Sequence, residues 1–135
     1  RRQRQMCIRD RATGGERRRA VIARGLAQGA DLIMLDEPTN HLDVRHQLML
    51  LDTLRASGRT VVATIHDLGM AASHFDHVVV LADGGVLSAG PAREALSPSN
   101  VATAFHVVAH HVTTPDGSQE LVCTAPLPNP DREEN

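Results

Sequence analysis

The chain has 135 residues, a formal net charge of −2 and 41% hydrophobic residues, which allow a single modest domain with a core. Its 14 basic residues are all arginine, so the sequence contains no phosphate-binding loop of the GxxxxGK-Ser/Thr type, whose lysine contacts the phosphates. The near-neutral charge argues against general polyanion binding, and with Phe75 and Phe105 as the only aromatic residues, base stacking on aromatic platforms is not expected.

Residues 1–11 fit neither the periodicity of a helix nor that of a strand. The string from Arg1 to Asp10 resembles one translation frame of a widely used transposase sequencing adaptor, and Arg11 fits the residue that would follow it. We interpret this segment as an artefact of a gene truncated at a library junction and exclude it from fold reasoning. The alternative is a natural basic N-terminal arm. We expect genuine sequence to begin at Ala12.

Helices and strands alternate in the next part of the chain. Good helix formers predict a helix over 16–28, which Gly29 closes. The apolar runs 32–35 and 60–65 predict strands that are buried on both faces of a parallel sheet. Between them, apolar spacing predicts a helix over 44–56. Leu48, Leu51 and Leu54 stand at helical spacing in this segment.

The remaining elements are shorter. We expect, in chain order, a helix capped by Asp67 that runs through Ser73, strands at 78–81 and 86–87 joined by a tight turn at 83–85, and helices at 91–96 and 98–105. A terminal hairpin is predicted from 106–113 and 121–124, around the turn at 115–117, followed by a flexible tail over 126–135. Strands alternating with helices indicate an α/β fold with mostly parallel strand order.

Two adjacent carboxylates, Asp36 and Glu37, follow the first of these strands and precede Pro38. Open α/β sheets place ligand-contacting residues at this end of a strand. A carboxylate such as Asp36 can hold Mg²⁺ through the water shell of the ion, and Glu37 can polarise the water that attacks a γ-phosphate. The alternative is a polar strand exit that binds no ligand.

A hydroxyl-Gly-Gly turn, Thr13-Gly14-Gly15-Glu16, opens the arginine-rich helix upstream. Glycine permits close backbone approach, and free amides at a helix N-terminus suit an anion. Taken alone, such a turn is more often a helix cap than a phosphate site. A single histidine, His66, follows the second apolar strand, and taken alone it would be a packed or solvated side chain. A zinc site at His106, His110 and His111 is disfavoured because strand periodicity places them on mixed faces.

In this order, the Gly-Gly turn, the Asp-Glu strand end and the downstream histidine resemble the second half of an ATP-binding-cassette (ABC) ATPase. The resemblance covers residues 12–125. It implies part of a P-loop NTPase sheet with flanking helices and a C-terminal hairpin. It also implies that Asp36 holds Mg²⁺ through water, that Glu37 is catalytic, and that His66 is the switch histidine that hydrogen-bonds the γ-phosphate.

The same resemblance makes Thr13, Gly14, Gly15 and Glu16 the signature loop, which contacts ATP bound by the opposite subunit. The usual family pattern is Leu-Ser-Gly-Gly-Glu/Gln. Thr13 keeps the hydroxyl donor of this pattern, whereas Ala12 lacks the apolar anchor of the leucine. Asp43 matches the D-loop residue that couples the two nucleotide sites of the dimer.

The stretch 67–71 after His66 resembles the His-Asp-Leu-x-x-Ala of importer ATPases, whereas ribosome-acting members more often show Ser-His-Asp-Arg. Residues 44–47, 94–96 and 104–107 resemble the ATPases of iron-siderophore, haem and cobalamin importers. The function implied is therefore ATP hydrolysis in such an importer. The alternatives are a soluble ABC protein acting on the ribosome, or an inactive cassette remnant.

The resemblance implies ATP and Mg²⁺ as cofactors. The implied partners are a second ATPase subunit (a homodimer), transmembrane permease subunits and, indirectly, a substrate-binding protein, without nucleic acid. No apolar run approaches the ~20 residues of a membrane span, and Cys7 and Cys123 lack paired spacing, which indicates a cytosolic chain. The resemblance implies a peripheral position on the cytoplasmic face of the membrane. The chain lacks the phosphate-binding loop, so we expect no ATP hydrolysis by this chain alone.

Overall fold

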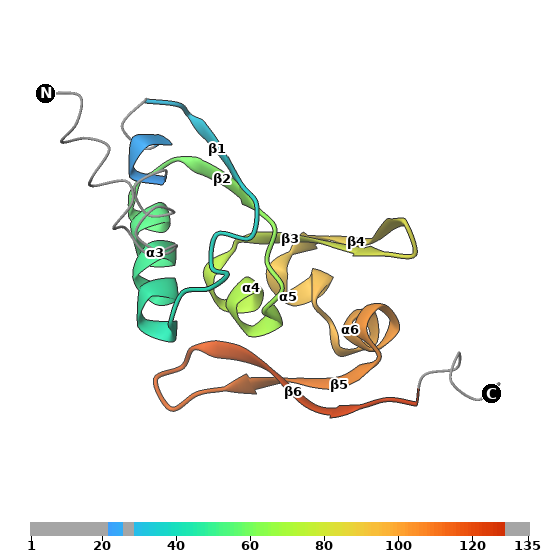
Figure 1. Cartoon of the computed structure of the whole chain (residues 1–135). Helices are drawn as coiled ribbons and strands as arrows, with labels where there is room; N and C mark the ends of the chain where they lie inside the picture. Colours follow the sequence, from blue (N-terminus) through green and yellow to red (C-terminus); the bar gives the residue numbers. More distant parts are fainter. Residues whose placement is uncertain (1–21, 26–28, 129–135) are drawn as a thin grey trace, which may run out of the picture. The chain divides into compact units, whose positions relative to one another are not determined.

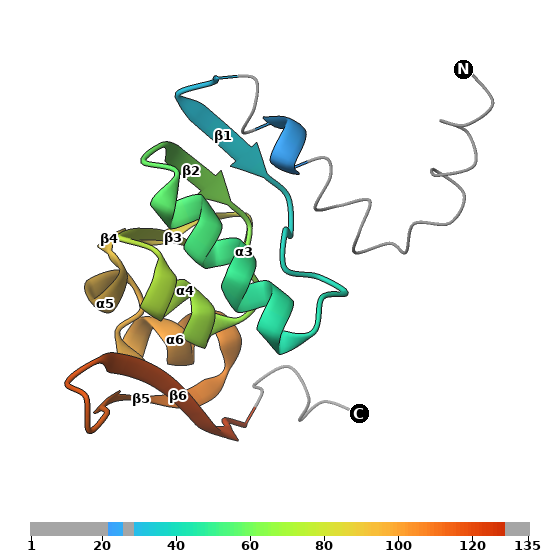
Figure 2. The ribbon, with the colours of Figure 1, turned by 90° about the vertical axis from the view of Figure 1, so that its left-hand side faces the viewer.

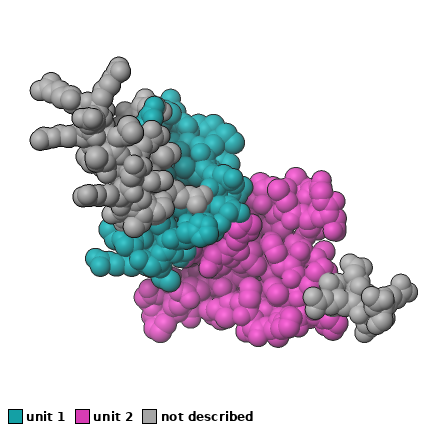
Figure 3. Space-filling model, in the orientation of Figure 1, with its two compact units in different colours: residues 1–65 teal, residues 66–135 magenta. Residues whose placement is uncertain are grey.

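The computed structural model of the chain describes residues 22–25 and 29–128 (Figure 1). The chain divides into two compact units, Arg1–Ile65 and His66–Asn135, which Figure 3 colours separately. The adaptor-like segment 1–11 and most of the helix expected over 16–28 lie outside the described residues, although residues 22–25 are helical as expected.

Unit 1 contains a strand–helix–strand element: β1 (Leu32–Leu35), α3 (Val44–Ala56) and β2 (Thr60–Ala63). The two strands are parallel, with Leu32 opposite Thr60 and Leu35 opposite Ala63. A parallel pair needs a long crossover, and α3 supplies it. The helix lies alongside the strand pair (Figure 2) and ends at Ser57, followed by Gly58 with a φ of +64°.

The core of unit 1 lies between α3 and one face of the strand pair. Its buried members are Ile22, Leu50 and Leu54, with Leu35, Leu42 and Val61 packed against them. The opposite face of the pair is open, since Met34 is 75% and Val62 is 50% exposed. The expectation of strands buried on both faces is therefore wrong for the described residues, because the helical layer of this unit covers only one face. Of the leucines at helical spacing in α3, Leu51 and Leu54 are buried, whereas Leu48 is 40% exposed.

Unit 2 consists of short helices between two hairpins (Figure 1). In chain order, its elements are α4 (Leu68–His74), β3 (His77–Ala82), β4 (Gly85–Pro91), α5 (Ala92–Ala95), α6 (Pro98–Phe105), β5 (Val107–Thr113) and β6 (Gln119–Pro126). Both hairpins are antiparallel. The expected mostly parallel order is thus wrong, because in the described part of the chain only β1 and β2 pair in parallel. Short turns force adjacent strands to run antiparallel.

The turns and caps of unit 2 follow local sequence signals. Asp83 and Gly84 have φ angles of +50° and +74°, the conformation of a two-residue hairpin turn. The Ser97 side chain caps α6 by accepting from the N–H of Asn100. The core includes Leu96, Val101 and Leu121, of which Val101 is completely buried.

The chain remains paired slightly beyond the point where the tail was expected to begin. Strand β6 includes Pro126, and the N–H of Leu127 donates to the carbonyl of His106 at 2.7 Å. Residues 129–135 lie outside the described residues. None of the helices in the described ranges is long and apolar enough to cross a lipid bilayer.

Candidate functional site

The candidate site lies where β1 and β2 end. Because the strands are parallel, the residues that follow them, Asp36 and Thr64, emerge at the same edge. The N–H of Thr64 donates to the carbonyl of Leu35 at 3.1 Å, which continues the pairing by one further bond. A hollow at this edge is lined by Met34, Leu35, Asp36, Val62, Ala63 and Thr64.

The hydroxyl of Thr64 joins the two adjacent carboxylate residues. It donates to Asp36 Oδ1 at 2.8 Å and accepts the backbone N–H of Glu37, also at 2.8 Å. The side chains of Asp36 and Thr64 are exposed, and that of Glu37 is half-buried. A single hydroxyl therefore fixes both the carboxylate of Asp36 and the backbone from which Glu37 projects.

Glu37 has an unusual backbone conformation. Its φ of +44° lies in the left-handed region, which is uncommon for a residue other than glycine and marks a locally strained position. Asn40 holds the same residue from the other side, because its N–H donates to the carbonyl of Glu37 at 3.2 Å and its side-chain amide donates to Glu37 Oε2. Pro38 is almost fully buried directly after it. The surrounding contacts thus stabilise this conformation.

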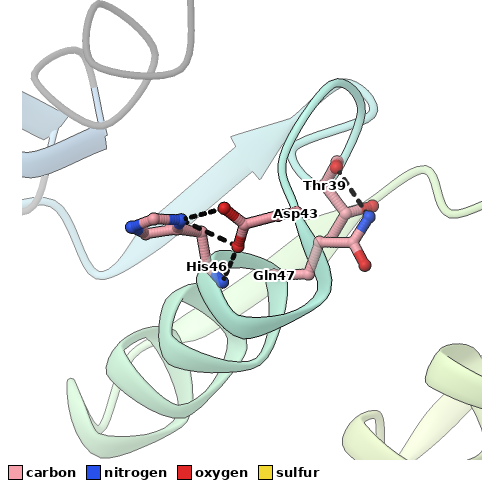
Figure 4. Close-up of polar contacts among 4 residues, drawn as sticks. All are labelled: Thr39, Asp43, His46 and Gln47. Atoms are coloured by element: carbon pink, nitrogen blue, oxygen red, sulfur yellow. Dashed lines mark hydrogen bonds and ion pairs between the residues drawn. The ribbon is translucent and has the colours of Figure 1, made fainter.

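Asp43 caps the helix that follows (Figure 4). Its Oδ1 accepts the N–H of His46 at 2.9 Å, and Nδ1 of the same histidine lies 2.7 Å from Oδ2. The backbone N–H and then the side chain of His46 hold the pKa of the Asp43 carboxyl below its ordinary value of 3.8. Gln47 anchors the preceding loop, since its side-chain amide donates to the carbonyl of the buried Thr39 at 3.1 Å.

His66 is exposed and opens unit 2, directly before the residue that caps α4. There, Asp67 Oδ1 accepts the N–H of Met70 at 2.8 Å. Gly69 lies beside this cap, and a Cβ at its position would lie 3.2 Å from Asp67 Oδ1 and 3.5 Å from the carbonyl of Leu121. The small residue in this motif therefore leaves the capping carboxylate undisturbed.

Asp36, Glu37 and Asp43 all lie in the segment of unit 1 between β1 and α3, whereas His66 begins unit 2. The proposed signature-loop residues Thr13, Gly14, Gly15 and Glu16 lie outside the described residues. Sequence reasoning missed two residues of the site, Asn40 and Thr64. Thr64 could have been found from its place directly after the second strand, whereas nothing in the sequence alone distinguishes Asn40 from an ordinary turn residue.

The side chains of the site can be compared with the ligands that Mg²⁺ prefers. The ion prefers hard oxygen ligands and keeps several waters, so one or two carboxylates are sufficient on the protein side. Asp36 supplies an exposed carboxylate, oriented by a hydroxyl. No group of three or more His, Cys, Asp or Glu side chains converges as metal ligands within residues 22–25 and 29–128. The donor set therefore fits a hydrated Mg²⁺.

Comparisons with known proteins give a consistent result. The chain is 44% identical over 121 residues to the cobalamin import ATP-binding protein of Halobacterium salinarum, covering 87% of this chain and 30% of that protein. It is 39% identical over 119 residues to the iron(3+)-hydroxamate import ATP-binding protein of Bacillus subtilis, covering 85% and 44%. The hemin import ATP-binding protein of Burkholderia ambifaria is 37% identical over 127 residues, covering 84% and 46%. No family model matches the chain.

A solved structure described as an inward-facing metal-chelate type ABC transporter matches with a TM-score of 0.73 and 27% identity, covering 84% of this chain and 47% of that one. The chain thus spans less than half the length of each of these relatives. The fold class expected from the motifs, part of an ABC ATPase sheet with helices and a C-terminal hairpin, is confirmed. Over most of its length, the chain is homologous to the ATP-binding subunits of ABC importers.

Proposed function

We propose that this chain is the C-terminal part of the ATP-hydrolysing subunit of an ABC importer for an iron chelate, haem or cobalamin. The observation that carries the proposal is the pair of adjacent carboxylates, Asp36 and Glu37, held in distinct orientations where two parallel strands end. The names of the relatives support the solute class, since they import cobalamin, iron(3+)-hydroxamate and hemin. They also favour an importer over a ribosome-acting protein.

Each residue of the site has a separate role in this proposal. Asp36 would hold the water shell of Mg²⁺, an ion that would supply positive charge to the phosphate oxygens. Glu37 accepts a hydrogen bond from the attacking water and so orients it toward the γ-phosphate. His66 hydrogen-bonds the γ-phosphate. Asp43, which caps the following helix and hydrogen-bonds His46, couples this site to its counterpart in the second subunit.

In this proposal, the phosphate-binding loop and the signature loop that act on one ATP belong to two different subunits. A chain without lysine cannot cradle the phosphates in the P-loop manner, so we assign that function to another part of the whole protein. The loop formed by Thr13, Gly14, Gly15 and Glu16 acts in trans on ATP bound by a second copy. Closure of the two subunits drives permease subunits through alternating access, on the cytoplasmic face of the membrane, with solute delivered by a substrate-binding protein.

The substitution Glu37→Gln tests the proposal in a full-length ATPase that carries these residues. We expect loss of steady-state ATP hydrolysis with retained ATP binding, because glutamine keeps the shape of the side chain but no longer polarises water. Glu120→Gln is the matched control, since it changes an exposed glutamate in the C-terminal hairpin. His66→Ala is also expected to lower turnover more than binding. Normal hydrolysis by the Glu37 variant would refute the assigned role.

A further inference from the structure

We propose that Thr64 is a positioning residue for both carboxylates of the site, an inference that rests on the proposed function. A hydroxyl has one proton to donate, and Thr64 donates it to Asp36 Oδ1 at 2.8 Å. Its lone pairs then accept the N–H of Glu37 at 2.8 Å. The direction of both hydrogen bonds is thereby fixed. The hydroxyl holds the orientation of the Asp36 carboxylate, which is the group that a hydrated Mg²⁺ would bind.

The backbone of Glu37 is strained. A non-glycine residue at a φ of +44° persists only where its surroundings hold it there. Asn40 holds the carbonyl and the carboxylate of Glu37, and Thr64 holds its N–H. Without the Thr64 hydroxyl, the hydrogen bond that ties the N–H of Glu37 to the end of β2 is lost. The carboxylates of Asp36 and Glu37 would then lose their fixed relation to each other.

The effect of Thr64 on activity can be distinguished from its effect on the stability of the fold. Thr64 is exposed and follows the last residue of β2, so its hydroxyl contributes little to the packed core. Residues that orient a metal ligand through a hydrogen bond typically change metal affinity or activity by about 10- to 100-fold when they are replaced. A large functional effect with an unchanged melting temperature is therefore the signature of positioning.

The experiment uses the full-length ATPase with Thr64→Val, which keeps the shape of the side chain and removes the hydroxyl, and with Thr64→Ser, which retains the hydroxyl. Thr53→Val is the matched control. Thr53 is exposed like Thr64 and its hydroxyl also donates a hydrogen bond, but the acceptor is the backbone carbonyl of Met49 at 2.7 Å, in the helix and not in the site. The measurements are kcat, the KM for ATP, the Mg²⁺ concentration for half-maximal activity, and the equilibrium affinity for ATP with Mg²⁺ and with EDTA.

We expect Thr64→Val to lower kcat by roughly tenfold or more and to raise the half-activating Mg²⁺ concentration by a similar factor. Its affinity for ATP in EDTA and its melting temperature should match the parent protein, while Thr64→Ser and Thr53→Val retain parental kinetics. If Thr64→Val keeps parental kcat and Mg²⁺ dependence while Glu37→Gln is inactive, Thr64 is not a positioning residue and the proposed function stands. If Glu37→Gln is active, the proposed function itself fails. Should Thr64→Val not fold, Thr64→Ala is subject to the same criteria.

Discussion

Replacing Leu54 by alanine tests how unit 1 is held together. Leu54 is 3% exposed and packs with Ile22 and Leu50, whereas Leu48 on the same helix is 40% exposed. Truncating a buried leucine removes its transfer free energy, at about 0.8 kcal/mol per methylene, and leaves a cavity. The expected loss in the free energy of unfolding is therefore about 3 kcal/mol for Leu54→Ala. For Leu48→Ala it is about 1 kcal/mol, because no closed cavity forms.

The assay is urea unfolding of the chain, followed by far-ultraviolet circular dichroism at several low protein concentrations. The midpoint should shift strongly for Leu54→Ala and slightly for Leu48→Ala, with equal slopes. Since the two substitutions remove the same atoms from one helix, their difference in helix propensity cancels. Equal losses for the two variants, or a larger loss for Leu48→Ala, would show that α3 turns a different face to the core than the one described.

Two further predictions concern the stability of a turn at low pH and the self-association of the chain. Hydrogen bonds from the Thr114 side chain and then from the Ser118 N–H lower the pKa of Asp116 from 3.8 to about 2, so its stabilisation of the turn is complete above pH 3.8 and is lost as the pH falls toward 2. In the Asp116→Asn variant, the loss of stability that Asp116 causes between pH 3.8 and 2 should be absent when unfolding is followed by circular dichroism. If the variant and the parent lose stability equally over this pH range, the prediction is wrong. We also expect the chain expressed alone to self-associate, because Met34 and Leu81 are 75% and 68% exposed. Replacing both by glutamine should shift light scattering toward monomer, and a monomeric parent would overturn this expectation.

Many elements of the fold can be predicted from short stretches of sequence. The helices α3 and α6 begin and end where caps, leucine spacing and Ser-Pro or Ser-Gly pairs predict. The Asp83-Gly84 turn follows from the need for two positive φ angles, which this pair of residues tolerates. These features depend on a few neighbouring residues, so the sequence alone is sufficient to predict them.

Burial could not be predicted in the same way. An apolar run such as 32–35 suits a strand covered on both faces, but whether a face is covered depends on other elements. In unit 1, Ile33 is 8% exposed, while Leu32 on the other face of β1 is 52% exposed. The outer face of the β3–β4 hairpin is likewise open at Val79 and Val86. These strands carry more apolar surface than the layers of their own unit cover.

In the site, too, some residues can be predicted from their sequence neighbours, whereas others depend on the pairing of distant strands. Asp36 and Glu37 are recognisable because they directly follow an apolar strand, and Asp43 because it precedes a helix that it caps. Thr64 lies 27 residues beyond Glu37, and its hydroxyl reaches Glu37 only because Leu35 pairs with Ala63 rather than with a neighbouring residue. A shift of the register by one residue would turn the side chain of Thr64 to the other face of the pair. The placement of the two carboxylates therefore depends on the register of the parallel strands, which no local motif encodes.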